Sequence, residues 1–365
     1  MRFSRKIIAL VITFFVAGSL ITGISALSFD SRDKLYSYDF SDIQLGIDSI
    51  TAEELQDTIT FLAGPNRQGR RNFTSGSLIA SQYIAHSLAS SGFKSFGESY
   101  FQTFDFHDVQ NPDFPVERLA TWASQNGYDI NLKARNVIGY LEGTTKKDEY
   151  VVIGAHYDHL GIQNGKLFPG ADDNASGTAG ALEIAEALGE LAEQGIRPER
   201  SIITVFFDAE EWGLWGSQYF AENPPVPFEK IIGMFNLDMI SRNAQDEVLL
   251  IGSPDLTDFA SRSPTLFEMV QAANADIGMK LLIPPEELRK EQIFWRSDQA
   301  SFFVQSPENN RIPVLFMNSG EHPDYHQPSD TADKINALKA RNITRLAFKT
   351  LWQLSDFEGL PIYNE

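Results

Sequence analysis

The chain has 365 residues, of which 42% are hydrophobic and 12% aromatic, a composition typical of a globular protein with a sizeable core. Its formal net charge of −19 argues against nucleic acid as a partner, because phosphate binding needs clustered lysine and arginine. The chain contains no cysteine, which excludes disulfides and thiolate metal ligands. Any zinc would therefore have to be held by histidine and carboxylate side chains.

The first 28 residues predict a targeting segment. Arg2, Arg5 and Lys6 form a basic start, and the residues that follow are apolar up to about residue 27. We expect a signal peptide cleaved near Ser28, with an uncleaved N-terminal anchor as the alternative, because the apolar stretch is long enough to span a membrane. Either way the remaining chain would lie outside the cytoplasm, periplasmic or secreted, and any membrane attachment would run through this segment alone. Residues 29–44 are expected to form an extended lead-in.

Helical and strand patterns then alternate along the chain. The expected helices span residues 51–62 (opened by a capping box at Thr51), 74–90, 174–194, 213–223, 264–277 and 335–354. The expected strands span residues 136–141, 149–155, 201–207, 231–237, 248–251 and 312–317, and residues 284–294 are expected to form an irregular surface loop. This alternation predicts an α/β fold with a mostly parallel central sheet, helices on both faces, and a single domain from about residue 45 to 360.

Histidine and acidic residues follow three of the expected strands. His156 comes after the strand at 149–155, Glu210 and Glu211 come after the strand at 201–207, and Asp238 comes after the strand at 231–237. Because the carboxyl ends of parallel strands gather at one edge of an open α/β sheet, we expect these side chains to converge there. Asp158, two residues after His156, is placed to hold the imidazole of a metal-binding histidine.

Residues 170–177 (GADDNASG) place two adjacent carboxylates, Asp172 and Asp173, between glycines and just before an expected helix. At least one of them can be directed into a cleft, where a carboxylate can bridge two cations. His326 lies in the turn-rich stretch 323–330, and His159 and His322 remain competing ligands.

The number of candidate ligands predicts two metal ions. The neighbouring acids Glu210 and Glu211 repel each other unless a cation or proton intervenes. Their side chains point in different directions, so one would bind a metal while the other takes a proton from an activated water. Two histidines and three carboxylates exceed the three protein ligands that a single catalytic zinc needs, which favours two zinc ions sharing one bridging ligand.

The chain resembles the secreted co-catalytic di-zinc aminopeptidases of the MH clan, which are similar to bacterial leucyl aminopeptidases and related to glutaminyl cyclases. Five motifs in family order carry the resemblance: HYD at 156–158, GADDNASG at 170–177, DAEEWG at 208–213, NLD at 236–238 and YHQPSD at 325–330. The resemblance implies a zinc-aminopeptidase-like catalytic domain that contains two Zn²⁺ ions. The ligand set that it implies is His156 and Asp238 for one zinc, Glu211 and His326 for the other, and Asp172 as the bridge, joined to Asp173 by a cis peptide.

The resemblance also implies the roles of three further residues. Asp158 would orient His156, Glu210 would be the general base, and Tyr325 would help to stabilise the oxyanion. The implied function is hydrolysis of N-terminal residues from peptides with a free N-terminus, through a water that bridges the two zinc ions. Carboxypeptidase action stays open.

Two alternative functions are a glutaminyl-cyclase-like acyltransferase on the same fold and a non-catalytic binding ectodomain. The complete ligand set favours the hydrolase, because relatives that only bind have lost ligands and the cyclases depart from the run at residues 172–174.

Overall fold

The structure, a computed structural model, describes residues 38–106, 121, 124–125, 133–255, 259–308 and 310–364. The predicted signal peptide or anchor and most of the predicted lead-in lie outside these residues. Within the described ranges, no helix combines the length and apolarity needed to cross a membrane.

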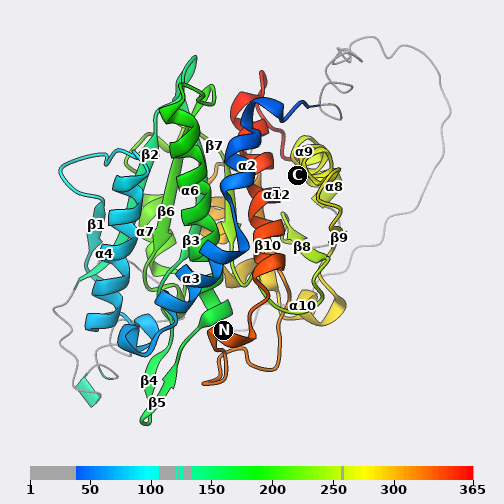
Figure 1. The fold of residues 1–365 in the computed structure, drawn as a ribbon. Coiled ribbons are helices and arrows are strands. Elements are labelled where there is room, and N and C mark those ends of the chain that lie inside the picture. Colours follow the sequence, from blue (N-terminus) through cyan, green and yellow to red (C-terminus); the bar gives the residue numbers. More distant parts are fainter. Residues whose placement is uncertain are drawn as a thin grey trace, which may run out of the picture.

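An eight-stranded mixed sheet forms the centre of the molecule, with the strand order β1-β2-β6-β3-β7-β10-β8-β9 (Figure 1). Strands β6, β3, β7 and β10 are parallel neighbours, as are β8 and β9, while the pairs β1–β2, β2–β6 and β8–β10 are antiparallel. The strands of the sheet are β1 (Phe101–Phe104), β2 (Ala134–Leu141), β3 (Lys146–His156), β6 (Arg200–Phe207), β7 (Ile231–Leu237), β8 (Glu247–Ile251), β9 (Lys280–Leu282) and β10 (Val314–Asn318). The predicted fold class is confirmed.

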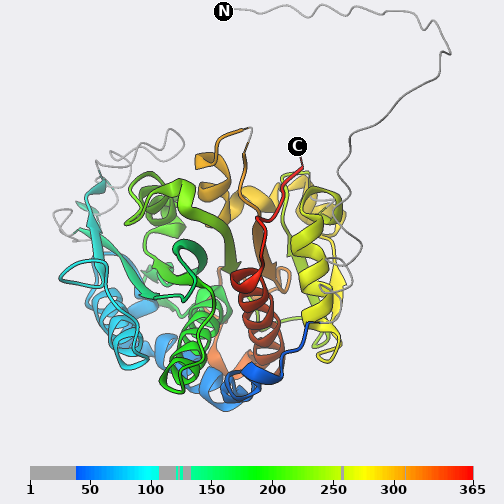
Figure 2. The same ribbon diagram turned by 90° about the horizontal axis from the view of Figure 1, so that it is seen from above.

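Helices cover both faces of this sheet. One face packs against α2, α3, α4, α6, α9 and α12, which Figure 2 shows along one side of the molecule, and the other face packs against α7, α10 and α11. The helices are α2 (Gln44–Ser49), α3 (Ala52–Leu62), α4 (Ser75–Ser90), α6 (Gly177–Glu193), α7 (Trp215–Glu222), α8 (Phe259–Arg262), α9 (Pro264–Asn274), α10 (Glu286–Lys290), α11 (Gln299–Gln305) and α12 (Ala337–Asp356).

Strand β6 shows why the central strands read as continuous apolar runs. Ile202 and Phe206 pack into the core under α6 and α12, whereas Val205 and Phe207 pack into the core under α7 and α11. Successive side chains of a strand point to opposite faces, so a strand covered on both sides must be apolar at every position. This two-sided burial fixes where each parallel strand ends, and hence where the residues that follow it emerge.

Several element boundaries follow local sequence signals. The prediction that Thr51 begins a helix is confirmed, because its hydroxyl accepts a hydrogen bond from the backbone N–H of Glu54. Residues 41–44, expected in the extended lead-in, are instead helical, since Ile43 and Ile47 bury their side chains in the core. The surface loop expected at 284–294 contains helix α10, whose Leu288 is buried.

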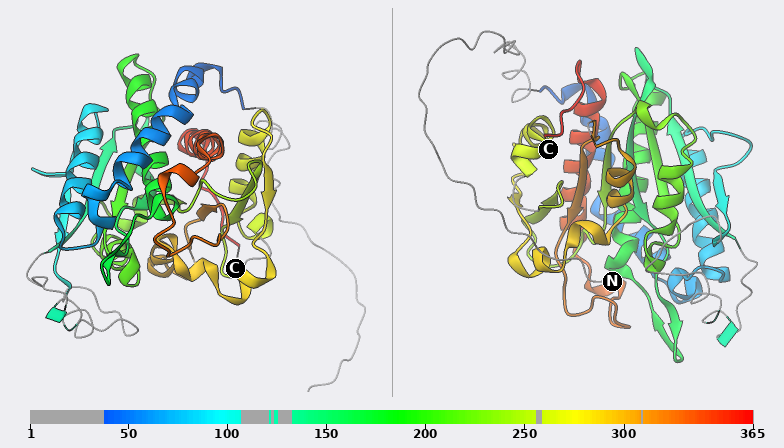
Figure 3. Two further views of the ribbon diagram at one scale, coloured as in Figure 1. Left: turned by 60° about the horizontal axis from the view of Figure 1, so that its bottom comes forward. Right: turned by 180° about the vertical axis from the view of Figure 1, so that it is seen from behind.

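A short hairpin of strands β4 (Gly161–Gln163) and β5 (Lys166–Phe168), also not predicted, follows β3. It projects from the end of the molecule at which the parallel strands finish, as the view from behind shows (Figure 3, right).

Glu183 on α6 is a buried carboxylate that gives the fold a testable pH dependence. Burial and repulsion from Glu186 and Glu54 raise the pKa of Glu183 to about 8, from an ordinary value of 4.5. A carboxyl group with a raised folded-state pKa stabilises the fold below its unfolded pKa, and this contribution is lost as the pH rises through the folded value. We expect Glu183→Gln to raise the thermal midpoint at about pH 9 by about 2 °C or more, and by less at about pH 5.

Thermal unfolding at the two pH values checks this expectation. The matched control is Glu193→Gln, which changes an exposed residue on the same helix and should shift the midpoint little at either pH. An equal gain at both pH values for Glu183→Gln would contradict the account.

Candidate metal centre

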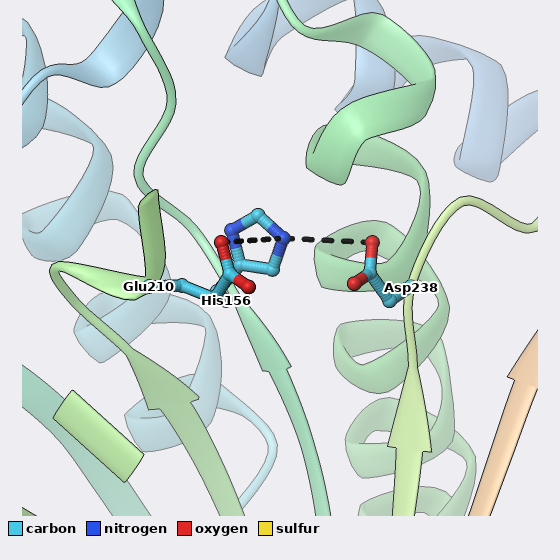
Figure 4. A group of neighbouring side chains, drawn as sticks. All are labelled: His156, Glu210 and Asp238. Carbon is cyan, nitrogen blue, oxygen red and sulfur yellow. Dashed lines mark ion pairs between the residues drawn. The ribbon is translucent and has the colours of Figure 1, made fainter. Parts of the chain in front are cut away.

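Side chains from three strand ends meet at the carboxyl edge of the sheet. His156 is the last residue of β3, Glu210 and Glu211 lie in the short 3₁₀-helix η5 (Glu210–Trp212) after β6, and Asp238 follows β7. Figure 4 shows His156 between Glu210 and Asp238. The structure thus brings together residues that are 82 positions apart in the sequence at their widest separation (238 minus 156).

The first ligand group is built around His156. Its Nε2 lies 3.3 Å from Oδ1 of Asp173, 3.5 Å from Oδ1 of Asp238 and 3.9 Å from Oε2 of Glu210. Ligand atoms of His156, Glu210 and Asp238 all lie within 4.8 Å of one another, close enough to surround one metal ion.

The second group contains two histidines. His326 Nε2 lies 3.0 Å from Oδ2 of Asp173 and 3.3 Å from Oε2 of Glu211. His159 Nδ1 lies 2.7 Å from Oε1 of Glu211 and 3.7 Å from Oδ2 of Asp173. Asp173 therefore faces His156 with one oxygen and His326 with the other, which is the position of a bridging carboxylate.

The structure does not place Asp172 in this cluster, so the bridging assignment made from the sequence is wrong by one residue. Oδ1 of Asp172 accepts hydrogen bonds from the backbone N–H (2.8 Å) and hydroxyl (2.6 Å) of Ser241 and from the hydroxyl of Ser176 (3.1 Å). Oδ2 lies 3.2 Å from Nε2 of His322, whose Nδ1 accepts a backbone N–H. Asp172 and His322 thus pair with each other behind the cluster instead of competing for a metal.

Hydrogen bonds from two other elements fix the backbone around Asp173. The cis peptide joins Asp173 to Asn174, one bond later than the resemblance implies. The Asn174 amide donates to the carbonyl of Leu237 (2.9 Å), which ties the turn to the end of β7. The carboxylate of Asp330 accepts the backbone N–H groups of both Asp172 and Asp173, each at 3.1 Å. Asp330 was not predicted as a site residue, although it closes the YHQPSD motif.

Asp158 contacts both His156 and Glu210. His156 Nδ1 lies 3.2 Å from the backbone oxygen of Asp158 and 3.6 Å from its carboxylate, and Oδ1 of Asp158 accepts the backbone N–H of Glu210 at 3.0 Å. With the Nδ1 proton donated to Asp158, Nε2 of His156 is left with a free lone pair facing the cluster, as a metal-binding histidine requires.

The electrostatics of the cluster are those of a cation site. Burial raises the pKa of Glu210 well above its ordinary range, and the charges of Glu211, Asp298 and Asp238 add to this effect against the opposing His156. Burial alone would lower the pKa of His326, but its hydrogen bonds to Asp173 and Glu211 raise it to about 11. So many buried carboxylates are stable together only if protons or cations neutralise them.

The residues fit zinc. Oδ1 of Asp238, 3.5 Å from Nε2 of His156, is buried without a hydrogen-bond partner among the described residues. Imidazole nitrogen and carboxylate oxygen are the ligands that zinc takes when thiolates are absent.

A cavity of about 380 Å³, counting the part open to solvent, lies over the cluster. Met239, Ile293 and Phe316 give it an apolar wall. Tyr325 also lines it, with its ring stacked on that of His326 at a centroid distance of 3.9 Å and its hydroxyl accepting a hydrogen bond from Arg296 at 3.3 Å.

The fold and the site define a class of α/β proteins in which candidate metal-binding side chains lie at the carboxyl edge of a mixed sheet. The chain belongs to peptidase family M28: residues 136–351, more than half of the chain, match the profile described as "Peptidase family M28". The match includes every motif that carries the resemblance.

Two related sequences agree with this family. A probable glutamate carboxypeptidase, LAMP1 of Arabidopsis thaliana, is 33% identical over 215 residues, which cover 56% of this chain but only 28% of that relative's own length. An aminopeptidase of Mus musculus, NAALADL1, is 38% identical over 131 residues, 35% of this chain and 16% of that relative. The chain thus spans less than a third of the length of these relatives.

Three solved structures share the fold. The LapA aminopeptidase of Legionella pneumophila has a TM-score of 0.63 and 20% identity, covering 94% of this chain and 81% of its own. The zinc aminopeptidase BSAP of Bacillus subtilis has a TM-score of 0.59 and 16% identity, and the match covers 86% of this chain and 98% of the BSAP chain. The glutaminyl cyclase of Porphyromonas gingivalis has a TM-score of 0.58 and 18% identity, and the match covers 82% of this chain and 97% of the cyclase chain.

Proposed function

We propose that the protein is a zinc-dependent exopeptidase that removes N-terminal residues from peptides. The observation that carries the proposal is the position of Asp173, whose two carboxylate oxygens face two separate groups of histidine and carboxylate ligands. That arrangement, with Glu210 beside it and a cavity above it, suits hydrolysis of a peptide bond at a pair of metal ions.

Two zinc ions would be held by five side chains. His156 and Asp238 would bind one ion, Glu211 and His326 the other, and Asp173 would bridge them. When bound, zinc lowers the pKa of a coordinated water and polarises the scissile carbonyl. His159, whose Nδ1 contacts Glu211, would hold that carboxylate in place.

Glu210 would act as the general base. Its carboxylate lies farther from His156 Nε2 than those of Asp173 and Asp238, and its backbone is fixed by Asp158. It would accept a proton from the attacking water and deliver it to the leaving amine.

Tyr325 would stabilise the negative charge that develops on the carbonyl oxygen. Its hydroxyl accepts a hydrogen bond from Arg296 and keeps its own proton to donate into the cavity. A donor fixed before the reaction stabilises the transition state more than one that must reorient.

The preference for a free N-terminus can be tested with paired substrates. Besides the proposed metal ligands, the cavity is lined by the carboxylates of Glu210 and Glu321, and such acidic groups favour a protonated α-amine over an acetylated one, which carries no charge. We expect zinc-loaded protein to release the first residue from aminoacyl nitroanilides and free peptides, and little from their N-acetylated forms. Equal cleavage of both forms would contradict aminopeptidase action and favour endopeptidase or carboxypeptidase action.

The same assay separates the two alternatives. Ammonia release from N-terminal glutamine without peptide cleavage would establish the cyclase. A zinc-loaded protein that binds peptides without releasing any product would favour the binding ectodomain.

We also propose that the first 28 residues direct export. The mature chain is expected to begin between about residues 25 and 29, because small residues in this stretch mark a signal-peptide cleavage site. N-terminal sequencing of the protein from its native source tests this, and an intact Met1 in carbonate-resistant membranes would favour the anchor.

A further inference from the structure

Arg70 is a buried arginine whose hydrogen bonds all go to backbone carbonyls. Nε donates to Tyr157 (2.7 Å), Nη1 donates to Leu62 (2.9 Å) and Pro169 (2.8 Å), and Nη2 donates to Gly170 (2.8 Å). The side chain is fully buried. One guanidinium therefore ties together three chain segments, two of which lie 87 to 100 positions later in the chain than Arg70.

Two of these segments carry the proposed metal ligands. Tyr157 lies directly after His156, and Gly170 lies three residues before Asp173. The third, Leu62, is the last residue of α3. The planar guanidinium presents donors in several fixed directions, which the single ammonium group of lysine cannot reproduce.

The backbone before Arg70 is bent to deliver this side chain. Gln68, Gly69 and Arg70 adopt positive φ angles of 50°, 60° and 49° in the segment η2 (Pro65–Arg70). At Gly69 a Cβ atom would lie 2.3 Å from the carbonyl oxygen of Phe168, so η2 is pressed against hairpin β4–β5 (Figure 1). Left-handed backbone is costly at non-glycine residues, so the conformations of Gln68 and Arg70 depend on the contacts that surround them.

The charge of Arg70 lies on the acidic side of the site. Burial lowers its pKa to about 10, opposed by the charges of Asp173, Asp158, Asp330 and Glu211. The guanidinium is thus charged near neutral pH. Within the part of the chain that the structure describes, Arg70 forms no direct ion pair, so its charge acts on the acidic cluster as a whole.

We propose that Arg70 is a positioning residue of the metal centre. It holds the loops that bear His156 and Asp173 in the arrangement that binds metal, and its charge offsets part of the repulsion among their carboxylate neighbours. Arg70 precedes the family-matched residues 136–351, so this support comes from the N-terminal part of the fold. The inference rests on the proposed zinc site.

The test is zinc affinity, measured by competition between the folded apoprotein and a chromogenic zinc chelator. Removing partners behind metal ligands typically lowers metal affinity by about 10–100-fold, and we expect Arg70→Met to raise the zinc Kd by that amount. Arg70→Lys keeps the charge but loses most of the carbonyl contacts, so its Kd should also rise, by less.

Arg200→Met is the matched control. Arg200 is also a buried arginine that donates to backbone carbonyls, those of Leu354, Phe357 and Gly359. It also pairs with Glu149, and it lies at the start of β6, the opposite end of the strand from Glu210. We expect its loss to lower the thermal midpoint while the zinc Kd stays within about twofold of the wild type, since no metal ligand lies at that end.

The outcomes separate this inference from the proposed function. If both Arg70 variants bind zinc like the wild type, the inference is wrong while the zinc site stands. If Arg70→Met does not fold, Arg70→Lys alone decides, and an unchanged Kd would overturn the inference. Wild-type protein that binds no zinc would overturn the proposed function, and the inference with it.

Discussion

Glu210→Gln is expected to lower turnover by about 10²–10⁴-fold while leaving the zinc content unchanged, because general acid–base catalysis typically contributes that much. The substitution keeps the size of the side chain and removes its ability to accept a proton. In the structure the Glu210 carboxylate borders the cluster at 3.9 Å from His156 Nε2, and its backbone N–H is held by Asp158. Steady-state kinetics on an aminoacyl nitroanilide, with metal analysis of the same sample, measures both quantities.

Glu211→Gln is the matched control for this variant. Glu211 contacts both His159 and His326, and we expect its substitution to reduce zinc content as well as activity. Loss of zinc in Glu210→Gln with zinc retained in Glu211→Gln would show that the two roles are exchanged.

Asp173→Ala is expected to have the larger effect on the metal centre, since it removes the carboxylate whose two oxygens face both ligand groups. The protein should then retain at most one zinc tightly, and activity should fall to the detection limit. Asp172→Ala removes a carboxylate that lies next to the cluster but contacts none of the proposed ligands. We expect this substitution to lower zinc affinity by about 10–100-fold without abolishing binding. Metal titration of the two variants compares them directly.

The contrast between these neighbours tests the correction made by the structure. Asp172 is bonded to Ser241, Ser176 and His322, whereas Asp173 faces His156 and His326. Complete loss of zinc in Asp172→Ala with normal binding in Asp173→Ala would restore the bridging role to Asp172.

The sheet and the edge on which the site lies could be predicted because both depend on local patterns. Continuous apolar runs such as β6 identify strands covered on both faces, and parallel strands deliver whatever follows them to one edge. His156, Glu210, Glu211 and Asp238 were located in this way. The choice between Asp172 and Asp173 could not be made, since it depends on backbone angles in a turn where successive side chains point in unrelated directions.

Long-range contacts account for the other omissions. An arginine side chain is not a usual metal ligand, so the sequence does not point to Arg70. Its proposed role depends on hydrogen bonds to carbonyls that lie about 90–100 positions later in the chain. His159 and His322 were open alternatives because their partners, Glu211 and Asp172, become neighbours only in the folded chain. Helix α10 was missed since its burial depends on Leu288 alone and the surrounding residues are charged.

The measurement that tests the central claim most directly is the zinc content of the purified protein, obtained by plasma-emission analysis or native mass spectrometry after removal of loosely bound metal. The account predicts two zinc ions per chain, with at most one retained tightly by Asp238→Ala. One ion or none in the wild-type protein would contradict the two-metal centre built around Asp173.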